Sequence, residues 1–171
     1  MSNLYGDWNR IENILNPKRL TSIFHRAAAR VGNYGAAMVQ KGIVSGAPGG
    51  YTFTPNSPVT VERKGSSKPL IDKGDLLGSV TYEVLDNGNG VFIGVKYGKE
   101  ANIAAVHEFG CMIGVTPKMR AYLHHEGIHL RKSTTHIFIP PRPFLEPVLM
   151  GSEFFSKVRE IYIKALTGAF L

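Results

Sequence analysis

The chain has 171 residues, of which 43% are hydrophobic, so it can bury a core of its own and is not a wholly disordered protein. Its 20 Lys and Arg against 13 Asp and Glu give a net charge of +7, which suits contact with nucleic acid, but we favour solubility as the explanation because the basic residues are scattered. The single cysteine, Cys111, excludes an internal disulfide, and neither a secretory signal pattern nor a membrane-spanning apolar run is present, so we expect a protein that is made and used without export.

The first predicted element is a long helix that follows a short lead-in, residues 1–16, expected to dock on the body. Asn16 and Pro17 form a helix start, with Asn as the N-cap and Pro at the first helical position. Apolar residues then recur at helical spacing, which predicts an amphipathic helix as far as about Gly42. Gly32 and Gly35 interrupt it, and they indicate a kink, a close approach of another backbone, or an exposed imperfection.

The next segment, Ser45 to Asp75, is rich in Gly, Pro, Ser and Lys. Only residues 59–63, with the sequence VTVER, alternate like a short strand. So long a segment with so little regular structure is unusual in a compact domain and is often functional or mobile. We interpret residues 45–75 as an extended arm or loop within a single domain, residues 1–171.

The second half of the chain predicts a hairpin, two short helices, a strand and a last helix. Residues 78–85 and 90–95 flank an Asn-Gly pair, the strongest short hairpin signal. The other predicted elements are a helix in 99–110 that ends at Gly110, a helix in 116–127 with Thr116 as N-cap, a strand in 135–139, and an amphipathic helix from 152 to about 168. Together these elements predict an α+β fold, in which a small antiparallel β-sheet of three or four strands packs against a long N-terminal helix and a C-terminal helix, beside the long extended arm.

Two groups of residues could bind a metal ion. His107, Glu108 and Cys111 follow the spacing of an HExxH zinc motif, with Cys in the place of the second His. Since Gly110 is expected to end the helix, the two ligands would not share a face, and we favour a histidine that packs or hydrogen-bonds locally. A second cluster, His124, His125 and His129, is interrupted by Gly127 and is better explained as an exposed helix end. No nucleophile elbow, dinucleotide fingerprint or phosphate loop is present, so we predict neither an enzyme nor a bound cofactor.

Two loose groups of basic residues could contact nucleic acid. They are Arg63, Lys64, Lys68 and Lys73 in the arm, and Lys118, Arg120, Arg131 and Lys132 further on. Aromatic residues for base stacking are not interleaved with them. A sequence-independent DNA-binding module is therefore the second functional hypothesis, and a zinc-dependent hydrolase is the third.

The stretch HIFIPPRPFLEP, residues 136–147, is either a polyproline ligand for another domain or a rigid corner of this one. Such ligands usually lie in disordered tails, whereas this stretch lies between a strand and a helix, and Phe144 and Leu145 favour burial. We prefer the corner, in which Arg142 is available for a bidentate contact with a carboxylate or with chain carbonyls.

Three blocks in order, PLIDKGDLLGSV (69–80), AAVHEFG (104–110) and IPPRPFLEP (139–147), resemble the pattern of the virion morphogenesis family, which comprises neck and tail-completion proteins of tailed bacteriophages. Lys73 and Pro141 depart from the pattern, at positions where the family usually has Thr and a small residue. The motif residues that we predict to be structural or to lie in an interface are Gly74, Leu76, Ser79, His107, Gly110, Ile139, Pro140, Arg142, Pro143, Phe144 and Leu145.

The resemblance implies a non-enzymatic structural protein of the virion, located at the head–tail junction and assembled in the cytoplasm of the host bacterium. It implies a ring of subunits, often six or twelve, around the channel through which the DNA passes. The partners it implies are other copies of the chain, other neck proteins, and a tail terminator or tail tube, with non-specific contact with viral DNA. From the residues themselves we also predict no bound metal, no cofactor and no membrane partner.

Overall fold

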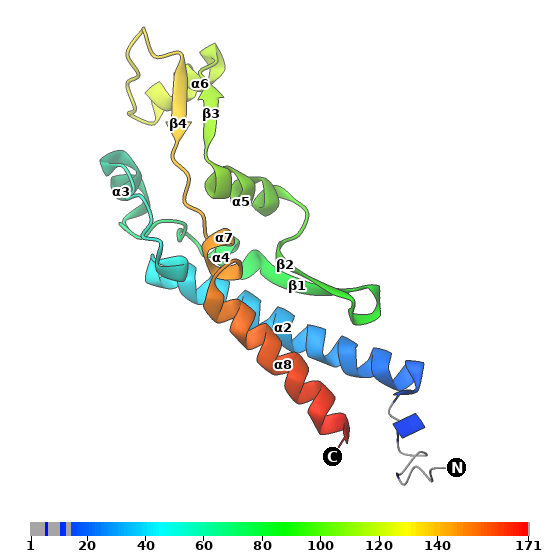
Figure 1. The fold of residues 1–171 in the computed structure, drawn as a ribbon. Coiled ribbons are helices and arrows are strands. Elements are labelled where there is room, and N and C mark those ends of the chain that lie inside the picture. Colours follow the sequence, from blue (N-terminus) through cyan, green and yellow to red (C-terminus); the bar gives the residue numbers. More distant parts are fainter. Residues whose placement is uncertain (1–5, 7–10, 13–14, 171) are drawn as a thin grey trace.

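The computed structural model describes residue 6, residues 11–12 and residues 15–170. Most of the predicted lead-in, residues 1–16, lies outside the described residues. The two long helices, α2 and α8, lie against one another along one side of the molecule (Figure 1). The predicted α+β fold, with a long N-terminal and a C-terminal helix, is confirmed.

Helix α2, Pro17–Ser45, begins and ends at local signals. The side-chain oxygen of Asn16 accepts a hydrogen bond of 3.0 Å from the backbone N–H of Lys18, and Pro17 takes the first helical position. Gly46 ends the helix with a φ of 74°, in the left-handed region, so the helix runs three residues beyond its predicted end at Gly42. Its buried face runs from Ile23 to Ile43 and forms the floor on which the other elements pack.

The predicted hairpin is confirmed as β1, Val80–Leu85, and β2, Gly90–Val95. The strands are antiparallel, pairing Val80 with Val95 at one end and Leu85 with Gly90 at the other, and the short 3-10 helix η2, Asp86–Gly88, joins them. Helix α4, Asp75–Ser79, leads into β1, and the hairpin packs on α2. Helix α8, Ser152–Phe170, completes this layer, and the predicted last helix is confirmed.

A second pair of strands, β3 (Cys111–Gly114) and β4 (His136–Ile139), forms a separate antiparallel sheet. The expectation of one sheet with three or four strands is therefore wrong: the described residues form two sheets of two strands each. Helix α5, Lys99–Phe109, carries the chain away from β2 before β3 begins, and β3 itself was not predicted. With helix α6, Pro117–His125, this second sheet lies at the end of the molecule opposite the C-terminal end of α8 (Figure 1).

The predicted strand at residues 59–63 is wrong, because these residues form helix α3, Pro58–Lys64. The Ser57 hydroxyl accepts a hydrogen bond of 3.2 Å from the N–H of Thr60, and Pro58 takes the first helical position. This start signal outweighs the alternation of Val and Thr. The same arrangement at Thr116, whose hydroxyl accepts from Met119 at 3.1 Å, confirms the predicted start of α6.

The main core lies where α2, α4, β1, α5 and the chain after β4 meet. Its buried residues are Ala36, Val39, Ile43, Phe53, Leu76, Val80, Ala104, Phe144 and Val148. Phe53 belongs to the predicted arm, so the first part of that segment, beyond the short 3-10 helix η1 (Pro48–Gly50), is anchored on the body. The short helix α7, Glu146–Leu149, adds Val148 and leads into α8.

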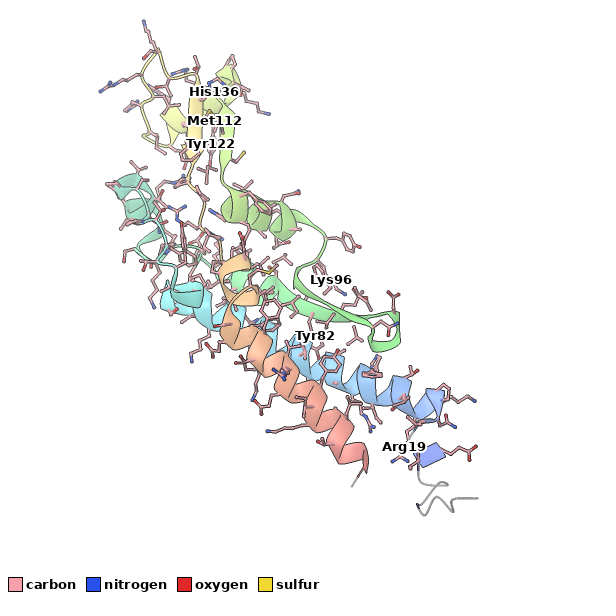
Figure 2. The ribbon with its side chains drawn as sticks, in the orientation of Figure 1. Arg19, Tyr82, Lys96, Met112, Tyr122 and His136 are labelled. Carbon is pink, nitrogen blue, oxygen red and sulfur yellow. The ribbon has the colours of Figure 1, made fainter. Side chains whose placement is uncertain are left out.

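Glycines inside α2 allow the hairpin to pack closely on the helix. A Cβ atom at Gly32 would lie 2.3 Å from the ring of Tyr82 on β1, and one at Gly35 would lie 2.5 Å from Ile93 on β2. Tyr82 is labelled in Figure 2, where the hairpin crosses α2. The three alternatives for these glycines resolve in favour of close approach, although side chains of the hairpin, and not its backbone, make the contact.

We expect Gly32→Ala to lower the free energy of unfolding by about 1–3 kcal/mol, because the added methyl group forces the Tyr82 ring to move and this outweighs the gain in helix propensity. Gly78→Ala in α4 is the matched control, since nothing lies within 4 Å of a Cβ there. This control is expected to be neutral or stabilising by up to about 1 kcal/mol. Urea denaturation of both variants tests the contact, and equal effects at the two positions would contradict it.

Candidate functional site

The chain leaves β4 at Ile139 and folds inward as a corner, which we define as residues 139–146. Pro140 and Pro141 end the strand, since proline cannot donate a hydrogen bond to the ladder. Of the side chains that follow, Arg142 is 6% exposed and Phe144 is 0% exposed. The interpretation of this stretch as a rigid corner of the fold is therefore confirmed.

Arg142 ties the corner to the predicted arm. Its Nε donates to the carbonyl oxygen of Thr54 at 2.7 Å, and its Nη2 donates to that of Pro55 at 2.9 Å. The sequence predicted that Arg142 binds either a carboxylate or chain carbonyls, and in the structure it binds chain carbonyls. The backbone N–H of Arg142 also donates to the carbonyl oxygen of His107, at 2.6 Å, at the end of α5. Burial lowers the pKa of Arg142, but a guanidinium remains charged at any pH at which the protein folds.

Glu108 on α5 holds the second half of the corner. Its Oε2 accepts hydrogen bonds from the backbone N–H groups of Phe144 at 2.8 Å and Leu145 at 3.1 Å, and its Oε1 accepts from that of Glu146 at 2.9 Å. The residue is 8% exposed. A buried carboxylate with three donors at the start of α7 replaces the N-cap side chain that this short helix lacks.

This role of Glu108 was not predicted from the sequence, where the residue was considered only as part of a zinc motif. The available signal is its spacing, because Glu108 lies four residues after the buried Ala104 and so falls on the apolar face of α5. A charged residue on such a face needs polar partners.

The three sequence blocks meet around this corner. Gly74 and Leu76 of the first block and His107 of the second line a cavity of about 330 Å³, together with Thr60 and Lys64 of α3. Leu76 belongs to the core. The other predicted motif residues lie nearby: Ser79 donates its hydroxyl to the carbonyl of Leu76 at 2.7 Å, Ile139 pairs with Cys111 in the second sheet, and Pro140, Pro143 and Leu145 are half-buried. Whether these residues also form an interface stays a prediction.

Gly110 ends α5, as predicted, and separates it from β3. Its φ of 73° lies in the left-handed region, and a Cβ atom there would lie 3.0 Å from Cδ of Pro141 and 3.1 Å from the carbonyl oxygen of Ile139. His107 and Cys111 consequently belong to a helix and a strand. In the part of the chain that the structure describes, no group of three or more His, Cys, Asp and Glu is placed to hold a metal ion.

The cluster at the end of α6 behaves as an exposed helix end. His124 and His129 stack edge to face with ring centroids 4.6 Å apart, and His125 lies 3.6 Å from Glu126. All three histidines are exposed.

His107 is the one described residue with a buried side-chain polar atom that has no hydrogen-bond partner, and this atom is its Nδ1. Burial lowers the pKa of His107, and the positive charges of Arg142 and Lys64 lower it further. The imidazole is therefore neutral at neutral pH.

We expect His107 to make the stability of the protein pH-dependent. Because its pKa is lowered in the folded state, only the unfolded chain takes up this proton as the pH falls below the ordinary value of 6.5. The free energy of unfolding should decrease from that pH downward and level off once the pH is below the lowered pKa. Urea denaturation between pH 5 and 8 tests this in wild type and His107→Gln, and a difference between the two curves that does not change with pH would contradict it.

Several basic side chains singled out in the sequence already have partners. Arg63 lies 3.7 Å from Glu126. The guanidinium of Arg120 donates to the carbonyl oxygens of Leu130, Arg131 and Thr134, at 3.3, 2.9 and 2.6 Å, and so holds the loop before β4.

Among the described residues, no helix is both long and apolar enough to cross a bilayer.

The three motif blocks of this mixed α+β chain meet at one corner, where Glu108 and Arg142 bind the chain's own backbone. Its sequence matches the model of the phage virion morphogenesis family over residues 7–166. The chain belongs to this family, as the resemblance indicated, and it has a structural or assembly role in a bacteriophage virion. Neither the curated proteins nor the solved structures contain a match to the chain.

Proposed function

We propose that the protein is a structural component of the phage head–tail junction, where copies of the chain form a ring around the DNA channel and join the head to the tail. Family membership supports a place in the virion, and the observation that carries the ring is the shape of the subunit. The second sheet and α6 extend from the body at one end, so one copy can reach the next (Figure 1). Contact between different surfaces of successive copies generates a ring when the rotation closes.

The projecting sheet has an apolar face that no described part of the chain covers. Met112 and Phe138 are directly opposite one another on this face and are 64% and 62% exposed. Figure 2 shows Met112 on this sheet, with Tyr122 of α6, which is 56% exposed. A sheet of only two strands is marginally stable alone, and each strand leaves one edge unpaired. A neighbouring subunit would cover the apolar face and pair an edge.

The proposed partners are other copies of the chain, in a ring of six or twelve, and the neck proteins, tail terminator or tail tube on either side. The part of the arm beyond the Arg142 contacts, with α3, extends beside the projecting sheet and would order against a neighbour (Figure 1). In this proposal the protein joins head to tail through the shape and contacts of its subunits, and this role needs no catalytic residue or cofactor. No contact favours the zinc hydrolase hypothesis, since Gly110 separates the two ligands that it requires.

Electron microscopy of purified phage particles tests the location, and a neck without this chain would contradict it. Native mass spectrometry of the purified protein tests the interface with Met112→Ser and Phe138→Ser combined, which should shift the oligomers toward monomer. Tyr97→Ser is the control, because it removes a side chain that is 98% exposed away from this sheet. Oligomers that survive the double substitution unchanged would show that the ring uses another surface.

A further inference from the structure

Helix α2 is basic, and most of its charge lies in its first half. Over Pro17–Ser45 it contains no Asp or Glu, and its five basic residues are Lys18, Arg19, Arg26, Arg30 and Lys41. The candidate DNA contacts predicted from the sequence lie elsewhere, in the arm and around α6. The structure points instead to three arginines of this helix.

Arg19, Arg26 and Arg30 line one groove between α2 and the end of α8. They are separated by seven and four residues, so at 3.6 residues per turn they fall on the same face of α2. Between them the groove, about 270 Å³ in volume, is walled by small or apolar residues, with one further cation on α8: Ile23, Ala27, Lys164, Ala165 and Gly168. Figure 2 labels Arg19 near the N-terminal end of α2.

The three arginines are exposed, and among the described residues none of them forms an ion pair. The acid nearest in sequence to the groove cation on α8 is already engaged: Glu160 binds Lys164 at 2.6 Å and Lys157 at 2.9 Å, and these two lysines lower its pKa to about 2. Of the four cations that line the groove, only Lys164 is paired with a described carboxylate, so the three arginines leave a positive charge there that no described ion pair balances.

We propose that this groove, defined by Arg19, Arg26 and Arg30, binds the phosphate backbone of double-stranded DNA without reading its sequence. The inference rests on the proposed function only in that the DNA would be the viral DNA passing through the junction. Guanidinium groups suit phosphate because they donate two parallel hydrogen bonds to its oxygens.

The geometry favours duplex DNA over an acidic protein segment. At 1.5 Å per residue the three arginines span about 16 Å along one face of a helix, so the three guanidinium groups can reach separate phosphates of a duplex. An acidic peptide would need apolar anchors, and the groove floor offers mainly alanine and glycine. Among the residues that the structure describes, no aromatic side chain lines the groove, and stacking on unpaired bases would need one.

The test is fluorescence anisotropy of the purified protein with a labelled random-sequence duplex, titrated at several salt concentrations. Wild type should bind at low salt, with log K falling linearly against log salt. Arg19→Gln, Arg26→Gln and Arg30→Gln combined should reduce the magnitude of this slope by about 2–3, since each lost phosphate contact removes about 0.9. The matched control neutralises three exposed basic side chains outside the groove, with Lys118→Gln, Arg131→Gln and Lys132→Gln combined. It should leave the slope close to that of wild type.

Equal slopes for the two triple variants, or no binding of duplex by wild type even at low salt, would overturn the proposal. A labelled polyglutamate peptide provides the rival ligand. The groove binds an acidic protein instead if wild type binds this peptide but not the duplex, and if the triple arginine variant no longer binds the peptide. Circular dichroism verifies that the variants fold. Native mass spectrometry follows their oligomers, so a failed ring and a failed DNA contact give different results.

Discussion

Glu108→Gln is expected to lower the free energy of unfolding by about 3 kcal/mol, although the substitution preserves the shape of the side chain. The carboxylate accepts from three successive backbone N–H groups of the corner, those of Phe144, Leu145 and Glu146. An amide retains one acceptor oxygen and places an NH₂ group against donors. At least one buried N–H then has no acceptor, and the charge that strengthened the other bonds is lost.

The matched control for this prediction is Glu62→Gln, because Glu62 is exposed on α3 and forms no ion pair among the described residues. It should change stability by less than about 0.5 kcal/mol. Urea denaturation measures both variants, and hydrogen exchange locates the effect: the amides of 144–146 should lose protection first in Glu108→Gln. A fully stable Glu108→Gln protein would mean that the corner holds its shape without the carboxylate.

Phe144→Ala is expected to cost about 3–5 kcal/mol, the usual range for removing a buried aromatic ring. Phe144 is 0% exposed and packs within the core that joins α2, α4 and α5. Because this residue also belongs to the corner, the resulting cavity should loosen the Arg142 contacts with the arm and the docking of α7. We therefore expect a fall in thermal stability together with faster proteolysis in the arm.

Phe155→Ala removes the same kind of side chain from the first turn of α8, where Phe155 is 55% exposed, and should cost about 1 kcal/mol or less. Differential scanning calorimetry compares the two variants, and limited proteolysis with mass spectrometry identifies the cleavage sites. Comparable losses at the two positions would contradict the central place of Phe144 in the core.

The sequence by itself determined the features that depend on neighbouring residues. Asn16-Pro17 and Thr116-Pro117 start helices because the capping oxygen reaches an N–H only two or three residues further on. Gly110 ends α5 and Asn-Gly marks the hairpin for similarly local reasons. Ser57-Pro58 is a helix start of the same local kind. The prediction of a strand gave more weight to the alternation of Val and Thr in the residues that follow.

Only the tertiary structure decided which elements contact one another. Glu108 finds its donors 36 to 38 residues away, and Arg142 binds carbonyls 87 and 88 residues away, so no local pattern indicates either contact. The separation of four strands into two sheets follows from where α5 places β3, and the arginine groove follows from where α8 ends on α2. Capping and turn geometry act over a few residues of chain, whereas burial and charge depend on distances in space that only the folded chain establishes.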